Sequence, residues 1–207
     1  MPADLIRAQI QDAWHEEQRR GAFAALIRSQ LARRAEASGA SSSPEDRERA
    51  AQDILEGWRL QLEQIPELID ALGAAADAAR VSDVVAPIVE AAEEYFLDPD
   101  DVLPDSHGIL GLMDDMYLAL SLLHSLSEQY RDLTGHPLID ADLVPSIQAV
   151  RALFQGRRLA ALDARIQTAL CRPAMLSSLQ ALSSLNHPLA VKSWSDKRAP
   201  AGLAGTL

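Results

Sequence analysis

The chain lacks most features of a secreted or membrane-spanning protein. It has one cysteine, Cys171, so no internal disulfide can form, which is typical of a reducing compartment. Its first twenty residues contain no apolar core of a secretory signal. The sequence contains no uninterrupted run of about 18 apolar residues, so it predicts no membrane-spanning helix. We therefore expect a cytoplasmic protein without stable membrane insertion.

Aromatic residues and strand-forming runs are also scarce. Aromatics make up 4% of the chain, and no run is rich in valine, isoleucine, threonine and tyrosine. The apolar fraction of 48% still suffices for a core, and it is dominated by alanine and leucine, which favour helices. The composition predicts an all-α fold, a single bundle of about six or seven helices.

Basic residues are absent from a long central segment. Between Val81 and Tyr130 there is no lysine or arginine, but there are eleven acidic residues. Of 30 acidic residues, 19 remain elsewhere and balance the 19 basic ones, so the whole net charge of −11 belongs to this segment. Phosphate contacts need clustered basic residues, which argues against a nucleic-acid partner and against an anionic membrane surface.

Apolar periodicity and breaker residues divide the chain into three parts. Residues 1–43 are predicted to hold one long helix, Ala3–Ala37, weakened at Gly21, and a serine-rich linker. Residues 44–190 form the helical core, and residues 191–207 a flexible tail. Core helices are expected at 44–64, 67–80, 82–96 and 114–133, then on either side of Gly156, and at 173–185. Pro66 should start or kink the second of them. Ser43 and Pro44 suit the cap and first position of the 44–64 helix, and Gly135 should end the helix that begins at 114. The buried stripe of that helix is expected at Met116, Leu120, Leu123, Leu126, Tyr130 and Leu133.

The segment Leu97–Asp115 separates two apolar helical stretches and contains six aspartates, two prolines and two glycines. Carboxylates are hard oxygen ligands that suit Mg²⁺, Ca²⁺ or Mn²⁺. The candidate metal ligands are Asp101, Asp105, Asp114 and Asp115, with His107 as a further candidate. The spacing is not that of an EF-hand, because Leu103 stands where a glycine is required.

The same aspartates also have a structural interpretation, which we favour. In it, Pro99 and Pro104 stiffen the loop, Asp101 and Asp105 accept hydrogen bonds from backbone N–H groups, and Asp114 or Asp115 caps the next helix. The metal hypothesis predicts that Mg²⁺, Ca²⁺ or Mn²⁺ raises the melting temperature, and that Asp101→Asn abolishes this shift. The two alternatives stay open at the level of sequence.

One motif in this segment resembles a known family. Tyr95, Pro99, Asp101, Pro104 and Asp105 supply its first half, and Gly111, Asp114 and Asp115 its second. Their order and spacing resemble the YkvA-like family, a bacterial domain of unknown function, over roughly residues 81–130. The chain departs from that family at Ser106-His107-Gly108, and its three glutamates at 90, 93 and 94 make the first helix more polar. The resemblance implies a helical fold and this loop geometry, and no activity.

Motifs of nucleophilic or nucleotide chemistry are absent from the sequence, which contains no GxSxG, Walker A or GxGxxG pattern. His124 and Glu128 share a helix face, but no second histidine completes an HExxH motif. Five arginines form a basic face on the C-terminal helices: Arg151, Arg157, Arg158, Arg165 and Arg172. They either pair within the fold, lie in solvent, or bind an anionic partner.

The two ends of the chain point to protein partners. A helix over residues 3–37 would be about 50 Å long and would pack on the body or pair with another chain. Trp194, a lone aromatic in the tail, is a candidate partner-binding residue. We therefore predict a non-enzymatic helical interaction or adaptor protein, with a protein partner or self-association. The alternatives are a divalent-metal-dependent hydrolase that uses the aspartates, and a protein whose 81–96 helix lies at a membrane.

Overall fold

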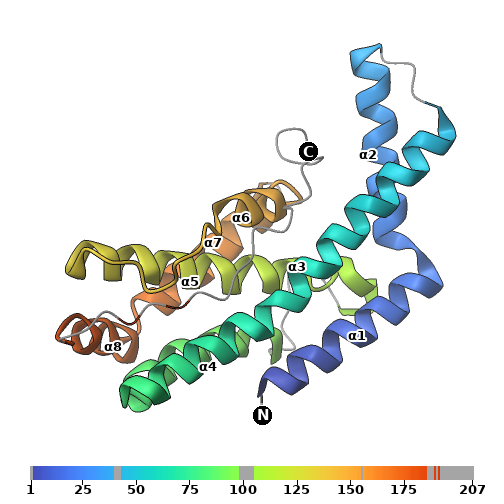
Figure 1. Ribbon diagram of the computed structural model, residues 1–207. Coiled ribbons are helices and arrows are strands. Elements are labelled where there is room, and N and C mark those ends of the chain that lie inside the picture. The colour runs from blue at the N-terminus through green and yellow to red at the C-terminus, as the bar shows by residue number, and fades with distance from the viewer. Residues whose placement is uncertain are drawn as a thin grey trace.

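The all-α prediction is confirmed by the computed structural model, which describes residues 2–39, 43–97, 105–154, 156–185, 189 and 191. This part of the chain holds eight α-helices and one 3₁₀-helix, so the predicted count of six or seven helices was too low (Figure 1). They are α1 (Pro2–Arg20), α2 (Ala22–Ser38), α3 (Pro44–Ala79), α4 (Ser82–Leu97), η1 (Asp105–Leu110), α5 (Met113–Thr134), α6 (Val144–Arg151), α7 (Arg157–Leu170) and α8 (Pro173–Ser183).

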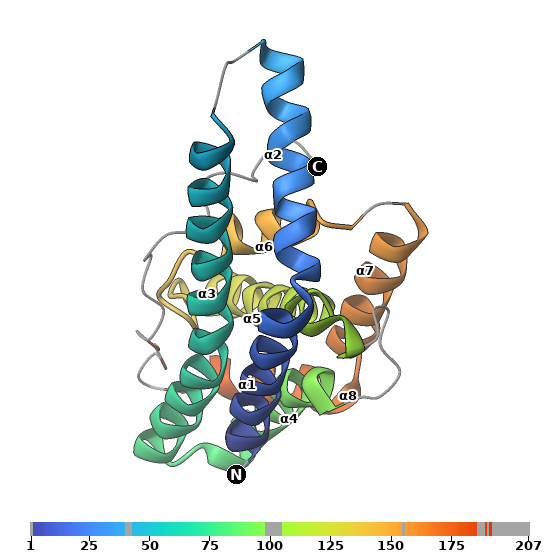
Figure 2. The ribbon, with the colours of Figure 1, turned by 90° about the vertical axis from the view of Figure 1, so that its right-hand side faces the viewer.

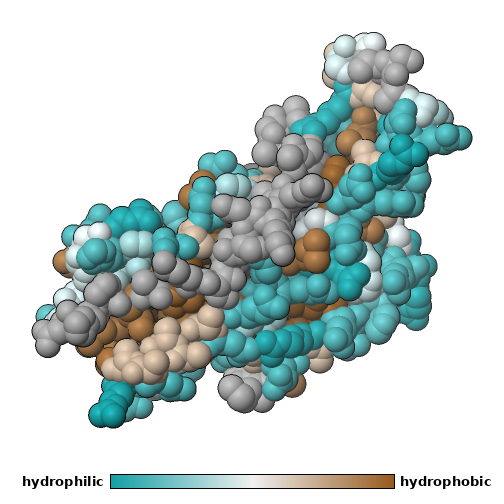
Figure 3. Space-filling view, viewed as in Figure 1, coloured by the Kyte–Doolittle hydropathy of each residue, from teal (hydrophilic) through white to brown (hydrophobic). Residues whose placement is uncertain are grey.

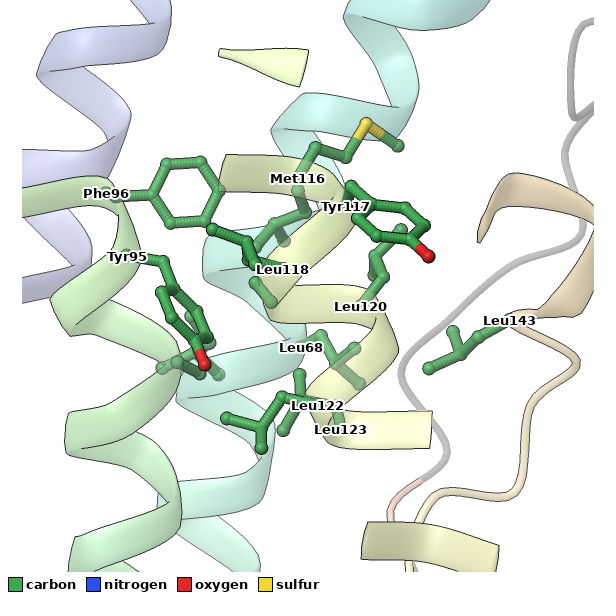
Figure 4. Close-up of a cluster of buried hydrophobic side chains, with 14 of the residues drawn as sticks. Leu68, Tyr95, Phe96, Met116, Tyr117, Leu118, Leu120, Leu122, Leu123 and Leu143 are labelled. Carbon is green, nitrogen blue, oxygen red and sulfur yellow. The ribbon is translucent and has the colours of Figure 1, made fainter. Parts of the chain in front are cut away.

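Helix α5 is the centre of the fold. It packs against α4, α6, α7 and α8, and every residue from Met113 to Leu123 is buried. Figure 4 shows side chains of α4 and α5, among them Phe96 and Leu118, meeting in one apolar cluster. The sequence predicted a single buried stripe on this helix, and its last member, Leu133, is instead 59% exposed. The predicted buried surface was too narrow because neighbouring helices enclose the first half of α5 on all sides.

This central position also explains the high hydropathy of α5. The segment Gly108–Thr134 is long and apolar enough to cross a membrane, but 83% of its most apolar 18-residue window is buried inside the molecule. The central helix of a globular domain has the same properties, so the segment is weak evidence for a span. The expectation of no stable membrane insertion stays a prediction.

The prediction of one long N-terminal helix is wrong, because the chain bends at Gly21. This residue has the left-handed backbone angles φ 61°, ψ 29°, which glycine adopts without steric cost. The carboxylate of Glu17 in α1 then accepts hydrogen bonds from the N–H groups of Phe23 (3.0 Å) and Ala24 (2.9 Å). Glu17 thus caps α2 and favours the bend. As a result α1 packs along η1, α3 and α4, and α2 leaves in another direction.

Helix α3 continues through Pro66, so the predicted start of a new helix there is wrong. A proline inside a helix costs about 3 kcal/mol or more. Burying one large aliphatic side chain contributes about 1.5–3 kcal/mol, and Ile65, Leu68 and Ile69 are buried on both sides of the proline. Tertiary packing therefore outweighs the local penalty. The predicted start is confirmed: Ser43 caps the helix by accepting from the Asp46 N–H at 3.0 Å, and Pro44 takes the first position.

The C-terminal part of the described chain follows the predicted breaks at Gly135, Gly156 and Pro173. Beyond α8 the chain returns to the core, where Leu189 and Val191 are buried. The Leu189 N–H donates to the Tyr130 hydroxyl at 3.1 Å, and Val191 pairs with Ile139 in an isolated parallel bridge. The packed chain therefore reaches at least to Val191, where the tail was predicted to begin, and residues 192–207 lie outside the described residues.

Candidate functional site

Most of the predicted aspartate site lies outside the described residues. This applies to Asp101, to the side chains of Asp105 and His107, and to Trp194. The main chain of Asp105 begins η1. Of the four predicted metal ligands, the structure thus places two side chains, those of Asp114 and Asp115.

Asp114 and Asp115 lie in the first turn of α5 and are 1% and 2% exposed. The positive end of a helix dipole stabilises carboxylates there, and both residues make interactions within the chain. Among the described residues, no group of three or more histidine, cysteine, aspartate or glutamate side chains could hold a metal ion. The placement suits the structural interpretation, and metal binding stays a prediction.

The position of η1, the segment that precedes α5, is fixed by its close packing on α1. Gly108 adopts φ 61°, ψ −135°, a conformation open only to glycine. A Cβ at this position would lie 3.1 Å from the Ala13 carbonyl oxygen and 3.2 Å from the Glu17 nitrogen. The end of the acidic segment therefore rests directly on the backbone of α1, next to the carboxylate that caps α2.

A polar cluster that the sequence did not predict joins α5, α6 and α7. The Tyr117 hydroxyl donates to Asp163 Oδ1 at 2.5 Å, and the Arg151 guanidinium donates to Asp163 Oδ2 at 3.3 Å and to the Tyr117 oxygen at 3.4 Å. Burial, then the hydrogen bond to Asp163, raises the pKa of Tyr117 to about 12. Tyr117 thus stays protonated and acts as a donor at neutral pH.

This cluster borders a pocket of about 370 Å³, which His124 and Gln167 also line. Both carboxylate oxygens of Asp163 already accept hydrogen bonds, one from Tyr117 and one from Arg151. The three side chains therefore interact mainly with one another. The available sequence signal was a tyrosine inside an apolar helix, since a buried hydroxyl normally needs a partner. The partners lie 34 and 46 residues along the chain, so spacing could not reveal them.

The predicted basic face is partly neutralised within the fold. Arg172 pairs with Glu94 of α4 at 2.6 Å, and the Arg165 guanidinium lies 5.7 Å from the Tyr95 ring centre. Arg151 pairs with Asp163 as described above. Arg157 and Arg158 are exposed at the start of α7. This distribution leaves little concentrated positive charge for an anionic macromolecule.

The most distinctive surface is a two-helix projection, here called the arm: α2 together with Ser43 and residues 44–58 of α3. Figure 2 shows the two helices side by side, extending beyond the rest of the molecule. At the base, the Phe23 and Trp58 rings pack edge to face with their centres 6.3 Å apart. Farther out, α2 has α3 as its main neighbour, and Arg28 pairs with Glu48 at 3.4 Å.

The outer part of the arm, residues 28–39 and 43–50, is called the arm tip and contains no buried residue. Apolar atoms reach the surface along the arm between polar ones (Figure 3). Its two helices carry opposite charge. Helix α2 has three arginines and one glutamate, whereas residues 44–56 of α3 have five acidic and two basic residues. The arm thus combines exposure, some apolar surface and two signs of charge.

Comparisons with known proteins assign no relative to this chain. No protein-family model matches it. The search of curated proteins and the search of solved structures gave no significant match either. The functional argument therefore rests on the geometry of the chain itself.

Proposed function

We propose that this chain is a non-enzymatic helical interaction protein that binds its partner through the arm. The arm tip carries this proposal, because about twenty helical residues project from the body without one buried side chain. Helix ends with so little burial are marginally stable alone, and a partner that covers them would supply the missing apolar contacts. Proteins use such helical faces for recognition of other helices.

The chemistry of the other described groups supports a binding role rather than catalysis. Asp114 and Asp115 are enclosed at the start of α5, and Tyr117, Asp163 and Arg151 are engaged with one another. A protein partner fits the mixed charge of the arm better than nucleic acid, which requires clustered basic residues. The free, exposed thiol of Cys171 supports a cytoplasmic location.

We further propose that residues 81–130 are a YkvA-like segment. In support, α4 and α5, which carry Tyr95, Asp114 and Asp115 of the motif, pack directly against each other. The first half of the motif lies outside the described residues from position 98 to 104. The metal-dependent hydrolase gains no support from the described residues and stays a prediction, tested by the melting scan with Mg²⁺, Ca²⁺ or Mn²⁺ and Asp101→Asn.

Site-specific photocrosslinking tests the binding role of the arm. A benzophenone amino acid replaces Arg33 in α2 or Asp53 in α3, two exposed positions on the arm. Matched controls carry the same group at Arg157 in α7 or Asp132 in α5, which are exposed on the body. After irradiation in cells, we expect covalent protein adducts from the arm positions in excess of those from the body positions.

The adducts are identified by mass spectrometry, so that a specific partner and a random collision are distinguished. A recurring partner at the arm positions, absent at the control positions, supports the proposal. Equal labelling at all four positions, together with a monomeric mass of the purified chain, contradicts it.

A further inference from the structure

A pocket of about 320 Å³ lies between α4 and α7, on the body of the molecule. Both helices pack on α5, but they make little direct contact with each other. The face of α7 that lines the pocket carries small residues at helical spacing, Ala161, Ala164 and Thr168, which leave room between the two helices. Sites for small molecules have volumes of about 300–1,000 Å³. The pocket is at the lower end of this range and therefore suits a small metabolite.

Tyr95 of α4 lines this pocket, and its hydroxyl has no hydrogen-bond partner among the described residues. The residue is only 4% exposed, and Figure 4 shows its side chain extending from α4 with the hydroxyl at the end. A buried polar atom normally has a partner, because leaving it without one costs free energy. An orphaned hydroxyl beside a pocket therefore points to a ligand that supplies an acceptor.

Two guanidinium groups lie at the same pocket. The Arg165 guanidinium is 5.7 Å from the centre of the Tyr95 ring, and Arg172 lines the pocket from the residue before α8. Burial raises the pKa of Tyr95, whereas the positive charges of Arg172 and Arg165 act in the opposite direction, so both lie close enough to influence the hydroxyl. At neutral pH, Tyr95 is thus a neutral donor beside two cations. Guanidinium groups bind carboxylate and phosphate oxygens with matching geometry.

Glu94 at this pocket leaves Arg172 accessible to a ligand. Its carboxylate accepts hydrogen bonds of 2.6 and 3.4 Å from Arg172, but the two side chains are 54% and 45% exposed. Exposed ion pairs contribute little to stability, so an anion in the pocket can share Arg172 with Glu94 or displace this carboxylate. The two arginines and one glutamate leave a single positive charge in excess, which suits a ligand with one negative charge.

We propose that the pocket between α4 and α7 binds a small organic anion, whose carboxylate or phosphate group is held by Arg165, Arg172 and the Tyr95 hydroxyl. The anion supplies the acceptor that the hydroxyl lacks, and the apolar part of the ligand lies against Ala161 and Ala164. This site goes beyond the proposed function, because it belongs to the body and does not depend on the arm.

Calorimetric titration of the full chain at constant ionic strength tests the site with four probes. Benzoate and phenyl phosphate share an apolar ring and differ in the anionic group. Benzamide is the neutral counterpart of benzoate, and inorganic phosphate has no apolar part. We expect at least one of the two ring anions to bind about tenfold more tightly than benzamide and inorganic phosphate, since a hydrogen bond to a charged group is worth about this factor. The tighter ring anion identifies the group that the pocket prefers.

Single substitutions then locate the binding. Arg165→Gln and Arg172→Gln should each weaken it by about tenfold. Tyr95→Phe should also weaken it, while the melting temperature stays the same or rises because an unsatisfied buried hydroxyl is removed. Glu94→Gln removes the carboxylate that competes for Arg172 and should bind the anion more tightly. Arg158→Gln, exposed near the start of α7, is the matched control and should bind like the unmodified chain.

Circular dichroism verifies that each variant keeps its helix content. Three results overturn the inference: neither ring anion binds at its highest soluble concentration, benzamide binds as tightly as both of them, or the variants at Arg165 and Arg172 bind as well as the unmodified chain. A loss in Arg158→Gln as large as in the two pocket variants would also overturn it, because the attraction would then come from the general charge of α7.

Discussion

At the scale of single residues, the clearest electrostatic feature of the fold is Glu93. It lies in α4 with 7% of its surface exposed, and burial, then the negative charges of Asp70 and Glu90, raises its pKa above the usual 4.5. The folded state therefore binds a proton at Glu93 more tightly than the unfolded chain. The resulting stabilisation is complete below pH 4.5 and is lost as the pH rises through the raised pKa.

Replacing Glu93 with glutamine removes the buried charge while keeping the shape. We expect Glu93→Gln to raise the melting temperature at pH 7 and to raise it less near pH 4.5, where more of the native side chain is protonated because its pKa is raised. Glu90→Gln, at an exposed position on the same helix, is the control and should have a smaller effect. A variant that loses stability equally at both pH values would show that the Glu93 carboxylate has a favourable partner.

Tyr117 provides a second residue-scale prediction. Tyr117→Phe removes the donor to Asp163, and hydrogen bonds to a charged group contribute about 1.5–3 kcal/mol. We expect a loss of this size in urea unfolding at pH 7. The stabilisation from the neutral hydroxyl is full below pH 10 and lost toward about 12, so the difference between variant and native chain should shrink there.

A double-mutant cycle with Asp163→Asn isolates this interaction from general loss of packing. Coupling between the two substitutions is the expected result. If the losses of unfolding free energy were strictly additive, the Tyr117 hydroxyl and Asp163 would not interact. The proposed stabilising contact between α5 and α7 would then be wrong.

At the scale of elements, the junction of η1 and α1 depends on Gly108. Gly108→Ala should destabilise the fold strongly, because its Cβ meets the α1 backbone and its angles suit glycine alone. Gly39→Ala is the matched control: its φ of 64° is similar, but nothing lies within 4 Å of the added Cβ. Thermal unfolding should show a clearly larger loss for Gly108→Ala than the roughly 1–2 kcal/mol of left-handed strain. Equal losses would contradict the close packing described here.

Local sequence signals predicted the elements well where the signal was itself local. The Ser43–Pro44 cap, the helix end at Gly135 and the start of α8 at Pro173 all follow from residues that act on their own neighbours. The bend at Gly21 was seen as a weak point but not as a break, because the stabilising Glu17 cap forms only once the chain has turned. Pro66 stayed helical through tertiary burial, which no local pattern contains.

The same distinction applies to the candidate site. The aspartates at the start of α5 were recognisable, since acidic residues favour a helix N-terminus. The Tyr117–Asp163–Arg151 cluster and the arm were not, because both depend on how distant segments meet in space. A sequence with 19 basic and 19 acidic residues outside 81–130 gave no hint that opposite charges gather on the two helices of the arm.

At the scale of the whole molecule, a densely packed body and a sparsely packed arm are joined through α3. The body encloses α5, and Phe23 and Trp58 at the base of the arm belong to the same buried core. Because no residue of the arm tip is fully buried, its stability should depend on what it binds, whereas the body should be independent of any partner. The account therefore predicts two regions with different sensitivity to a bound partner.

Hydrogen exchange of the chain alone and in complex with the protein that crosslinks to the arm tests this claim most directly. If the arm is the interaction surface, amides in residues 28–39 and 43–50 gain protection in the complex, while amides of α5 keep the same protection. Unchanged exchange in the arm, or added protection confined to the body, would contradict the account.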